Sequence, residues 1–299
     1  MKNTILLSIA LVVVGMMLLV TAASAQTGSV SRGGLLYDNW RKVVDAEAPG
    51  NDHPLWATQS TNTRSGADTW RCKECHGWDY LGKDGAYGSG SHMTGFVGVY
   101  EAAQTKSVDE LAAALKGATN PDHDFSSVLD DVAIADLATF LKEGTIDVRQ
   151  YVDYDTKATR NANENHGKEL YGSACAACHG ADGAQINFND DAEPEYIGDI
   201  AAGNPQEFLH KVRAGQPGTP MPSGIELGWS MQDVVDVLAH AQTLPTGEEM
   251  ALTLPETGGN RLPVTSLALV LSGLLTMGLG LAMLAVQLQR RARLWAGQD

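Results

Sequence analysis

The four cysteines of the chain fall into two short motifs, each with a histidine directly after its second cysteine. The motifs are Cys72-Lys73-Glu74-Cys75-His76 and Cys175-Ala176-Ala177-Cys178-His179. This CxxCH pattern is typical of c-type haem attachment, because two thiols three residues apart can reach both vinyl groups of one porphyrin. The adjacent histidine then binds the iron. We therefore expect two covalent haems, held by the four cysteines, with His76 and His179 as iron ligands.

Other uses of these cysteines explain the pattern less well. A CxxC redox disulfide does not call for a histidine directly after it, least of all twice. A zinc site could use two cysteine pairs, but both histidines would then be coincidences. With two haems bound, no cysteine is left for a disulfide or a free thiol.

The first 25 residues have the features of a secretory signal peptide. Lys2 gives a positive start, residues 5–20 are apolar, and Ala23-Ser24-Ala25 is a small-residue cleavage site. We expect cleavage after Ala25; an uncleaved anchor is the alternative. Export suits c-type haem, which bacteria attach outside the cytoplasm.

The C-terminal region has the features of a membrane anchor. Residues 262–289 carry no charge and are long enough to span a bilayer as a helix. The basic tail 290–299 predicts a cytoplasmic C-terminus and an external domain before it. The preceding linker, 246–261, contains Leu254-Pro255-Glu256-Thr257-Gly258, which resembles the LPxTG sorting signal of sortase-anchored surface proteins. That resemblance implies cleavage after Thr257 and attachment to the cell wall, and retention in the membrane remains the alternative.

A helical pattern occurs twice, once around each motif. In the second copy, helices are expected after Asn204 and after Ser230, which are suitable capping residues. The last of these carries apolar residues at helical spacing, and the first copy repeats them 100 positions earlier, after Asp130. Ser107 would begin the middle helix of the first copy. The first copy differs by an insertion at 46–70 and a Gly-rich stretch at 85–98.

Both copies resemble class I cytochrome c domains, over 29–145 and 163–245, with 146–162 as a linker between them. The resemblance implies a mainly α fold with two tandem cytochrome c domains, to which the C-terminal transmembrane helix is added. In the second copy, Thr219-Pro220-Met221-Pro222 looks like the loop of this family that supplies a methionine ligand. The resemblance therefore implies Met221 as the sixth ligand of the second haem.

No methionine occupies the matching place in the first copy. Met221 lies 9 residues beyond Val212, the last apolar residue of the middle helix, and His123 lies 8 beyond its counterpart Leu115. Position thus favours His123 as the sixth ligand of the first haem. His92 or Met93 in the Gly-rich stretch, or an open iron site, are the alternatives.

The remaining histidines and the tryptophans have no comparable placement. We expect surface or structural roles for four histidines: His53, His166, His210 and His240. Three tryptophans near the first motif are expected to pack on the porphyrin: Trp56, Trp70 and Trp78.

The formal net charge of −15 argues against binding to nucleic acid and favours docking onto a basic surface. The resemblance implies an extracytoplasmic, surface-anchored electron carrier that exchanges single electrons with redox proteins. A subunit of a larger respiratory complex is one alternative. A dihaem redox enzyme, peroxidase-like or acting on sulfur compounds, is the other.

Overall fold

The computed structural model describes residues 28–253 and is mainly helical, as the sequence predicts. It contains no extended strand within these residues, only three isolated bridges. None of the helices in this range is long and apolar enough to cross a membrane. The predicted signal peptide 1–25, the LPETG motif, the span 262–289 and the basic tail lie outside the described residues. Two units are distinguished, 1–247 and 248–299, and the first contains both motifs.

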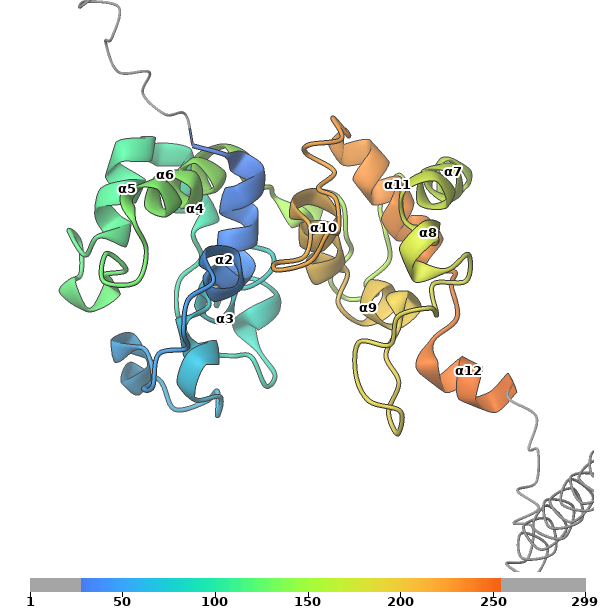
Figure 1. The fold of residues 1–299 in the computed structure, drawn as a ribbon, viewed down its shortest axis with the longest axis horizontal. Helices are drawn as coiled ribbons and strands as arrows, with labels where there is room; N and C mark the ends of the chain where they lie inside the picture. Colours follow the sequence, from blue (N-terminus) through green and yellow to red (C-terminus); the bar gives the residue numbers. More distant parts are fainter. Residues whose placement is uncertain (1–27, 254–299) are drawn as a thin grey trace, which may run out of the picture. The chain divides into compact units, whose positions relative to one another are not determined.

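Residues 30–150, here called the first half, contain five α-helices and shorter helical turns (Figure 1). The α-helices are α2 (Val30–Val44), α3 (Cys72–His76), α4 (Tyr100–Thr105), α5 (Val108–Leu115) and α6 (Asp131–Thr139), which continues as the π-helical turn η5 (Phe140–Gly144). The 3₁₀ turns are η1 (Pro54–Thr58), η2 (Gly66–Trp70), η3 (Ala86–Gly88), η4 (Pro121–His123) and η6 (Val148–Gln150).

Residues 164–241, here called the second half, contain the remaining helices of the first unit. These are α7 (Glu164–Ala174), α8 (Ala176–His179), α9 (Ile197–Gly203), α10 (Pro205–Ala214) and α11 (Met231–Ala241). One further helix, α12 (Gly247–Thr253), falls in the stretch that the sequence predicts as a linker.

The helices begin where the capping residues predict. Ser107 and Ser230 each form a capping box with the acidic residue three positions on. The side chains of Asp130 and Asn204 accept hydrogen bonds from the first turns of α6 and α10. These bonds satisfy backbone N–H groups that the helix itself leaves unpaired.

Each half is built on one pair of crossing helices, α2 with α6 and α7 with α11. At the crossings, Gly33 and Gly167 pack directly on the other helix, where a Cβ atom would overlap the carbonyl oxygen of Asp136 or Asp236. The same two aspartates accept hydrogen bonds from the backbone N–H groups of Ser29 (2.6 Å) and Asn163 (2.7 Å). The two crossings therefore use the same close approach and the same capping aspartate.

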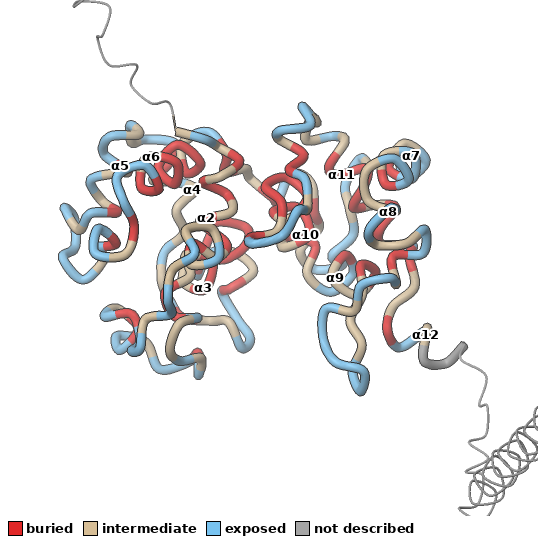
Figure 2. Tube along the Cα trace, in the orientation of Figure 1, coloured by how far each residue is buried: buried red, intermediate tan, exposed pale blue. Residues whose placement is uncertain are grey.

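The two halves share one apolar core, and α10 packs on α2. Figure 2 shows buried residues along α2, α6, α10 and α11. At this contact, Tyr80 donates a hydrogen bond to Nδ1 of His210 (2.9 Å), and Nε2 of His210 donates to the carbonyl of Gly34 (3.0 Å). Burial lowers the pKa of His210 to about 3, so the ring is neutral. His210 thus has a structural role, as expected.

A buried carboxylate adds charge to the same contact. Asp38 on α2 forms ion pairs with Arg71 (2.6 Å) and with Lys211 on α10. Burial alone would raise the pKa of Asp38, but the two cations outweigh it and the pKa is lowered. The carboxylate of Asp38 is therefore ionised inside the fold, between the positive charges of Arg71 and Lys211.

Residues 146–162, expected as a linker, are folded against the first half. Val148 and Val152 are 1% exposed. The hydroxyl of Tyr154 donates to Asp79 (2.9 Å), and Arg160 pairs with Asp153 (2.7 Å). Two buried valines and a hydrogen bond to Asp79 thus hold a stretch that looks polar in sequence.

Candidate functional site

The first CxxCH motif forms the single helical turn α3, which ends at Gly77 with a φ of 77°. Cys72, Cys75 and His76 line a cavity of about 240 Å³. Most of the remaining wall is apolar, with Leu111, Leu115, Phe125, Leu137 and Leu141 among the lining residues. The cysteines are free, and no disulfide competes for them in the part of the chain described.

Three histidines line this cavity: His76 from the motif, His123 from η4, and His53, which precedes η1. Nδ1 of His76 donates to the carbonyl of Val97 (2.7 Å), and Nδ1 of His123 lies 3.4 Å from the carbonyl of Ala114. Both rings therefore keep Nε2 available, as metal-bound histidines do when a carbonyl orients the other nitrogen. The two ring centroids are 6.2 Å apart.

This separation leaves room for a metal ion between the rings. The rings of His53 and His123 are 6.1 Å apart, so it is the place of His76 directly after Cys75, and not the distance, that favours His76 as the partner of His123. A metal–imidazole bond is about 2 Å long, and the ring centre lies about 1 Å farther, so two ligands on opposite sides of one ion have centres about 6 Å apart. Burial lowers the pKa of His76 to about 4 and lowers that of His123, which keeps both rings neutral. The first motif and His123 therefore fit a haem with two histidine ligands.

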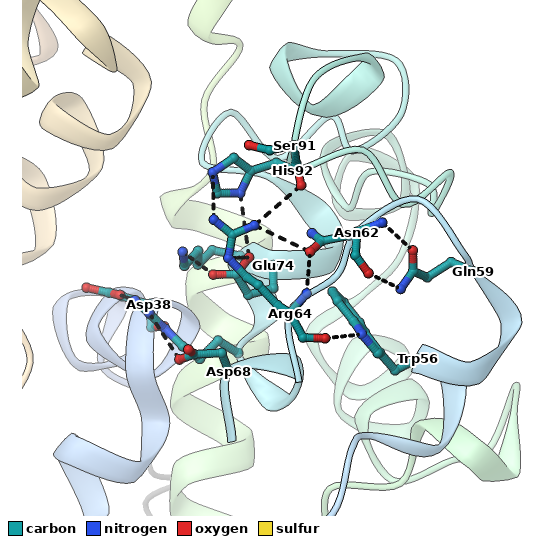
Figure 3. A network of polar contacts seen from close by, with 11 residues as sticks. Asp38, Trp56, Gln59, Asn62, Arg64, Asp68, Glu74, Ser91 and His92 are labelled. Carbon is teal, nitrogen blue, oxygen red and sulfur yellow. Dashed lines mark hydrogen bonds and ion pairs between the residues drawn. The ribbon is translucent and has the colours of Figure 1, made fainter. Parts of the chain in front are cut away.

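The alternative ligands His92 and Met93 lie elsewhere. His92 stacks on Tyr87 at 4.6 Å, and its Nε2 lies 3.2 Å from the guanidinium of Arg64 (Figure 3). The carbonyl of Met93 accepts a hydrogen bond from Thr61 (2.6 Å). Neither residue belongs to the cavity wall within the described chain.

The same polar network ties the 46–70 insertion to the first motif. Glu74, 1% exposed, lies between Lys73, Arg64 and His92, and Figure 3 shows Arg64 placed between His92 and Glu74. Burial would raise the pKa of Glu74, but the nearby imidazole of His92 and the charges of Lys73 and Arg64 lower it to about 2. A carboxylate inside the motif is thus held ionised by residues of two loops.

The second motif spans the end of α7 and the turn α8, and it ends at Gly180 with a φ of 83°. Cys178 is exposed, and the ring of His179 lies 6.0 Å from that of Phe188. Nδ1 of His179 is buried without a hydrogen-bond partner among the described residues. In the described structure, Nδ1 of His179 therefore lacks the orienting carbonyl that His76 and His123 have.

Met221 lies half-buried in the loop between α10 and α11, where its backbone N–H donates to Thr219 (3.3 Å). No hydrogen bond or ring contact joins it to His179 in the described structure. The role of Met221 as the sixth ligand of the second haem stays a prediction.

Both motifs are held by the same tyrosine contact. The hydroxyl of Tyr37 on α2 donates to the carbonyl of Gly77 (2.7 Å), and that of Tyr171 on α7 donates to the carbonyl of Gly180 (3.0 Å). In each half, the first helix therefore fixes the residue that directly follows the motif histidine.

The structure shows which of the tryptophans near the first motif line the cavity, and it adds a histidine that the sequence did not assign to the site. Trp70 lines the cavity, as expected, but Trp78 packs on His210 at 5.1 Å, away from it. His53 lines the cavity, and its ring lies 6.1 Å from that of His123. The insertion that carries His53 has no counterpart in the second half, so the internal repeat gave no signal for this residue.

Comparison with known proteins assigns the second half. Residues 162–240 match the protein-family model described as "Cytochrome C oxidase, cbb3-type, subunit III". This range is a cytochrome c-type domain, which implies a covalently bound c-type haem and a role in electron transfer. No curated protein and no solved structure matches the chain.

Proposed function

We propose that this chain is a dihaem c-type cytochrome that carries single electrons between redox proteins on the outer face of the cell. The main support is the pair His76 and His123, whose rings lie 6.2 Å apart in a cavity that also contains Cys72 and Cys75. When bound, each haem supplies an iron that takes up and releases one electron. The second motif, within the matched cytochrome c-type domain, supplies the other centre.

Side chains and backbone groups of the chain perform three tasks in this function. Cys72, Cys75, Cys175 and Cys178 would hold the two porphyrins covalently. The carbonyls of Val97 and Ala114 orient His76 and His123, and the apolar wall excludes water from the first iron. Low polarity around a redox centre reduces the solvent rearrangement that each electron transfer requires.

Different ligands would give the two centres different potentials. We infer His76 and His123 for the first iron, and His179 and Met221 for the second. Methionine ligation raises the reduction potential of a c-type haem, so the first haem should be the lower-potential centre.

Low-temperature EPR of the purified holoprotein, with spectroelectrochemical titration, tests this assignment. We expect two low-spin haems, one with bis-histidine and one with histidine–methionine character. A high-spin first haem that binds cyanide or CO would instead indicate a dihaem redox enzyme, peroxidase-like or acting on sulfur compounds.

The loop 181–196 supports a basic redox partner for the second haem. It carries five carboxylates and no lysine or arginine: Asp182, Asp190, Asp191, Glu193 and Glu195. Phe188 in the same loop is 42% exposed and contacts His179, so an apolar side chain lies among acidic ones next to the motif. Charge complementarity of this kind accelerates encounter and depends on salt.

Stopped-flow electron transfer to a small basic redox protein tests this surface. A variant with Asp190→Asn, Asp191→Asn and Glu193→Gln should react several-fold more slowly at low salt and lose most of its salt dependence. A matched control neutralises Glu101, Asp109 and Glu143, which are exposed in the first half. Equal effects of the two triple variants would argue against docking at this loop.

The location outside the cytoplasm rests on the sequence. We propose export by the signal peptide 1–25 and anchoring through the span 262–289 or, after cleavage at the LPETG motif, through the cell wall. Fractionation of cells that express wild type and Thr257→Val distinguishes the two. Wall attachment requires the variant to shift to the membrane, whereas an unchanged membrane fraction indicates retention.

A second candidate function is favoured by the family match. The matched description is that of an oxidase subunit, so this chain could serve as the cytochrome subunit of a larger respiratory complex. Purification from native membranes in mild detergent separates the alternatives. A stoichiometric partner with its own redox centre would support the complex, and a chain that elutes alone would support the free carrier.

A further inference from the structure

His53 is a buried histidine whose place in the fold is fixed on several sides. It caps the turn η1, and its backbone N–H donates to the hydroxyl of Thr69 (2.9 Å). The ring packs 4.7 Å from Trp70 and 5.2 Å from Phe125, and the residue is 4% exposed. The side chain is therefore held in one position.

Its two ring nitrogens differ in their contacts. The backbone N–H of Leu55 donates to Nδ1 (3.2 Å), so in the neutral ring the proton is on Nε2. Nε2 is buried and has no hydrogen-bond partner among the described residues. A buried donor without an acceptor costs about 1–3 kcal/mol, so a group bound in the cavity that supplies an acceptor would stabilise this ring position.

The residues that share the cavity with His53 point to the group that would supply this acceptor. His53 lines the same cavity as the first motif and His123. A haem in this cavity brings two propionate carboxylates, and a carboxylate placed against an apolar wall needs a hydrogen-bond donor.

Other polar side chains of the wall either have partners or are accessible to water. Arg71 is bound to Asp38 (2.6 Å), the hydroxyl of Thr69 donates to Gly66 (2.6 Å), and Lys106 is only half-buried, within reach of water. Among the described residues of the wall, the Nε2–H of His53 is thus a buried donor without a hydrogen-bond acceptor.

We propose that Nε2 of His53 donates a hydrogen bond to a propionate of the first haem, and that His53 is a positioning residue for this cofactor. The proposal rests on the proposed function, because it requires a haem at the first motif. The insertion 46–70, which has no counterpart in the second half, would then provide both the histidine and the turn η1 that orients its ring. A hydrogen bond to this carboxylate also reduces its negative charge near the iron, which raises the reduction potential.

Two substitutions separate this role from a structural one. Asn is a good capping residue, so His53→Asn can still accept the hydrogen bond from Leu55, but its amide is too short to reach the position of Nε2. His53→Gln can place an N–H donor close to that position. The readout is the redox-induced infrared difference spectrum of protein loaded with haem ¹³C-labelled at the propionates, recorded across the redox wave of the first haem.

We expect His53→Asn to lose the hydrogen-bonded carboxylate band and to lower the potential of the first haem, with the second haem unchanged. His53→Gln should retain the band. A band unchanged in His53→Asn would overturn the proposal and leave His53 a structural residue. Loss of the low-spin bis-histidine EPR signal of the first haem in His53→Asn would also overturn it, because that result would make His53 an iron ligand.

A measurement on the wild type keeps the proposal testable if the variants do not fold. In the reduced, diamagnetic holoprotein, the Nε2 proton of His53 should exchange slowly with water and show an NOE to the propionate methylene protons. Absence of that NOE would contradict the hydrogen bond. If no haem is bound at Cys72 and Cys75, the proposed function itself fails, and haem quantification shows this independently.

Discussion

The two halves of the first unit share a scaffold but differ in what surrounds the motif. Both cross their first and last helices at a glycine, cap the first helix with an aspartate, and hold the motif by a tyrosine hydroxyl. In the first half, an insertion and a Gly-rich loop enclose the motif, and two histidines face each other. In the second half, the motif has an exposed cysteine beside an acidic loop.

This difference indicates that the helices that hold the motif are the same in both halves, whereas the loops that surround the motif vary. Helix crossing and tyrosine contact position the CxxCH turn in both halves, whereas the loops around the turn differ: His53 and His123 line the cavity of the first motif, and an acidic loop lies beside the second. The first motif is therefore the more enclosed of the two, and the second is the more exposed.

Removal of the cysteines of one motif should have the largest effect, because it removes one of the two centres that are compared. Cys72→Ala with Cys75→Ala, and Cys175→Ala with Cys178→Ala, should each reduce the haem content from two per chain to one. Mass spectrometry and the pyridine haemochrome assay measure this content. A full complement in either double variant would show that the mutated motif holds no haem.

Exchange of the sixth ligands should make the two centres more alike. We expect His123→Met to raise the potential of the first haem, and Met221→His to lower that of the second, each by on the order of 0.1 V. Spectroelectrochemistry of the single and double variants checks this. If His123→Met leaves the low-potential wave in place, His123 is not the ligand.

Loss of the buried ion cluster should weaken the contact between the halves. Lys211→Met leaves Asp38 with one cation instead of two in a buried site, and we expect a loss of about 3 kcal/mol in the free energy of unfolding. The matched control is Lys116→Met, which breaks an exposed pair with Asp131 and should cost less than about 1 kcal/mol. Denaturant unfolding of the holoproteins measures both, and equal losses would refute a special role for the buried cluster.

The carboxylate of Glu74 should make the first half sensitive to acid. Its pKa is about 2 in the fold, against about 4.5 ordinarily, so its ionised form stabilises the fold above pH 4.5. The stabilisation is lost as the pH falls from 4.5 to 2 and amounts to at most about 3 kcal/mol.

Glu74→Gln should therefore be less stable than wild type at neutral pH and match it near pH 2. Unfolding curves at several pH values test this, with the exposed Glu143→Gln as the control. A stability difference that does not change with pH would rule out the ionised carboxylate as its source.

Much of the fold was predictable because its signals are local. Ser107, Asp130, Asn204 and Ser230 mark helix starts by hydrogen bonds that reach only three residues along the chain. The position of His123 followed from comparison with the other copy. The packing of 146–162 was not predictable, because two valines, Val148 and Val152, fix that stretch through long-range contacts.

The sequence by itself determined the two CxxCH motifs, the helical repeat around them and the expectation of haem, since each depends on neighbours a few residues apart. Only the tertiary structure decided that His76 and His123 face each other, that His53 lines their cavity, and that His92 belongs to a polar network. It also decided that Asp38 meets Lys211, 173 positions away. Such contacts depend on how whole helices and loops pack, and no local pattern of residues encodes them.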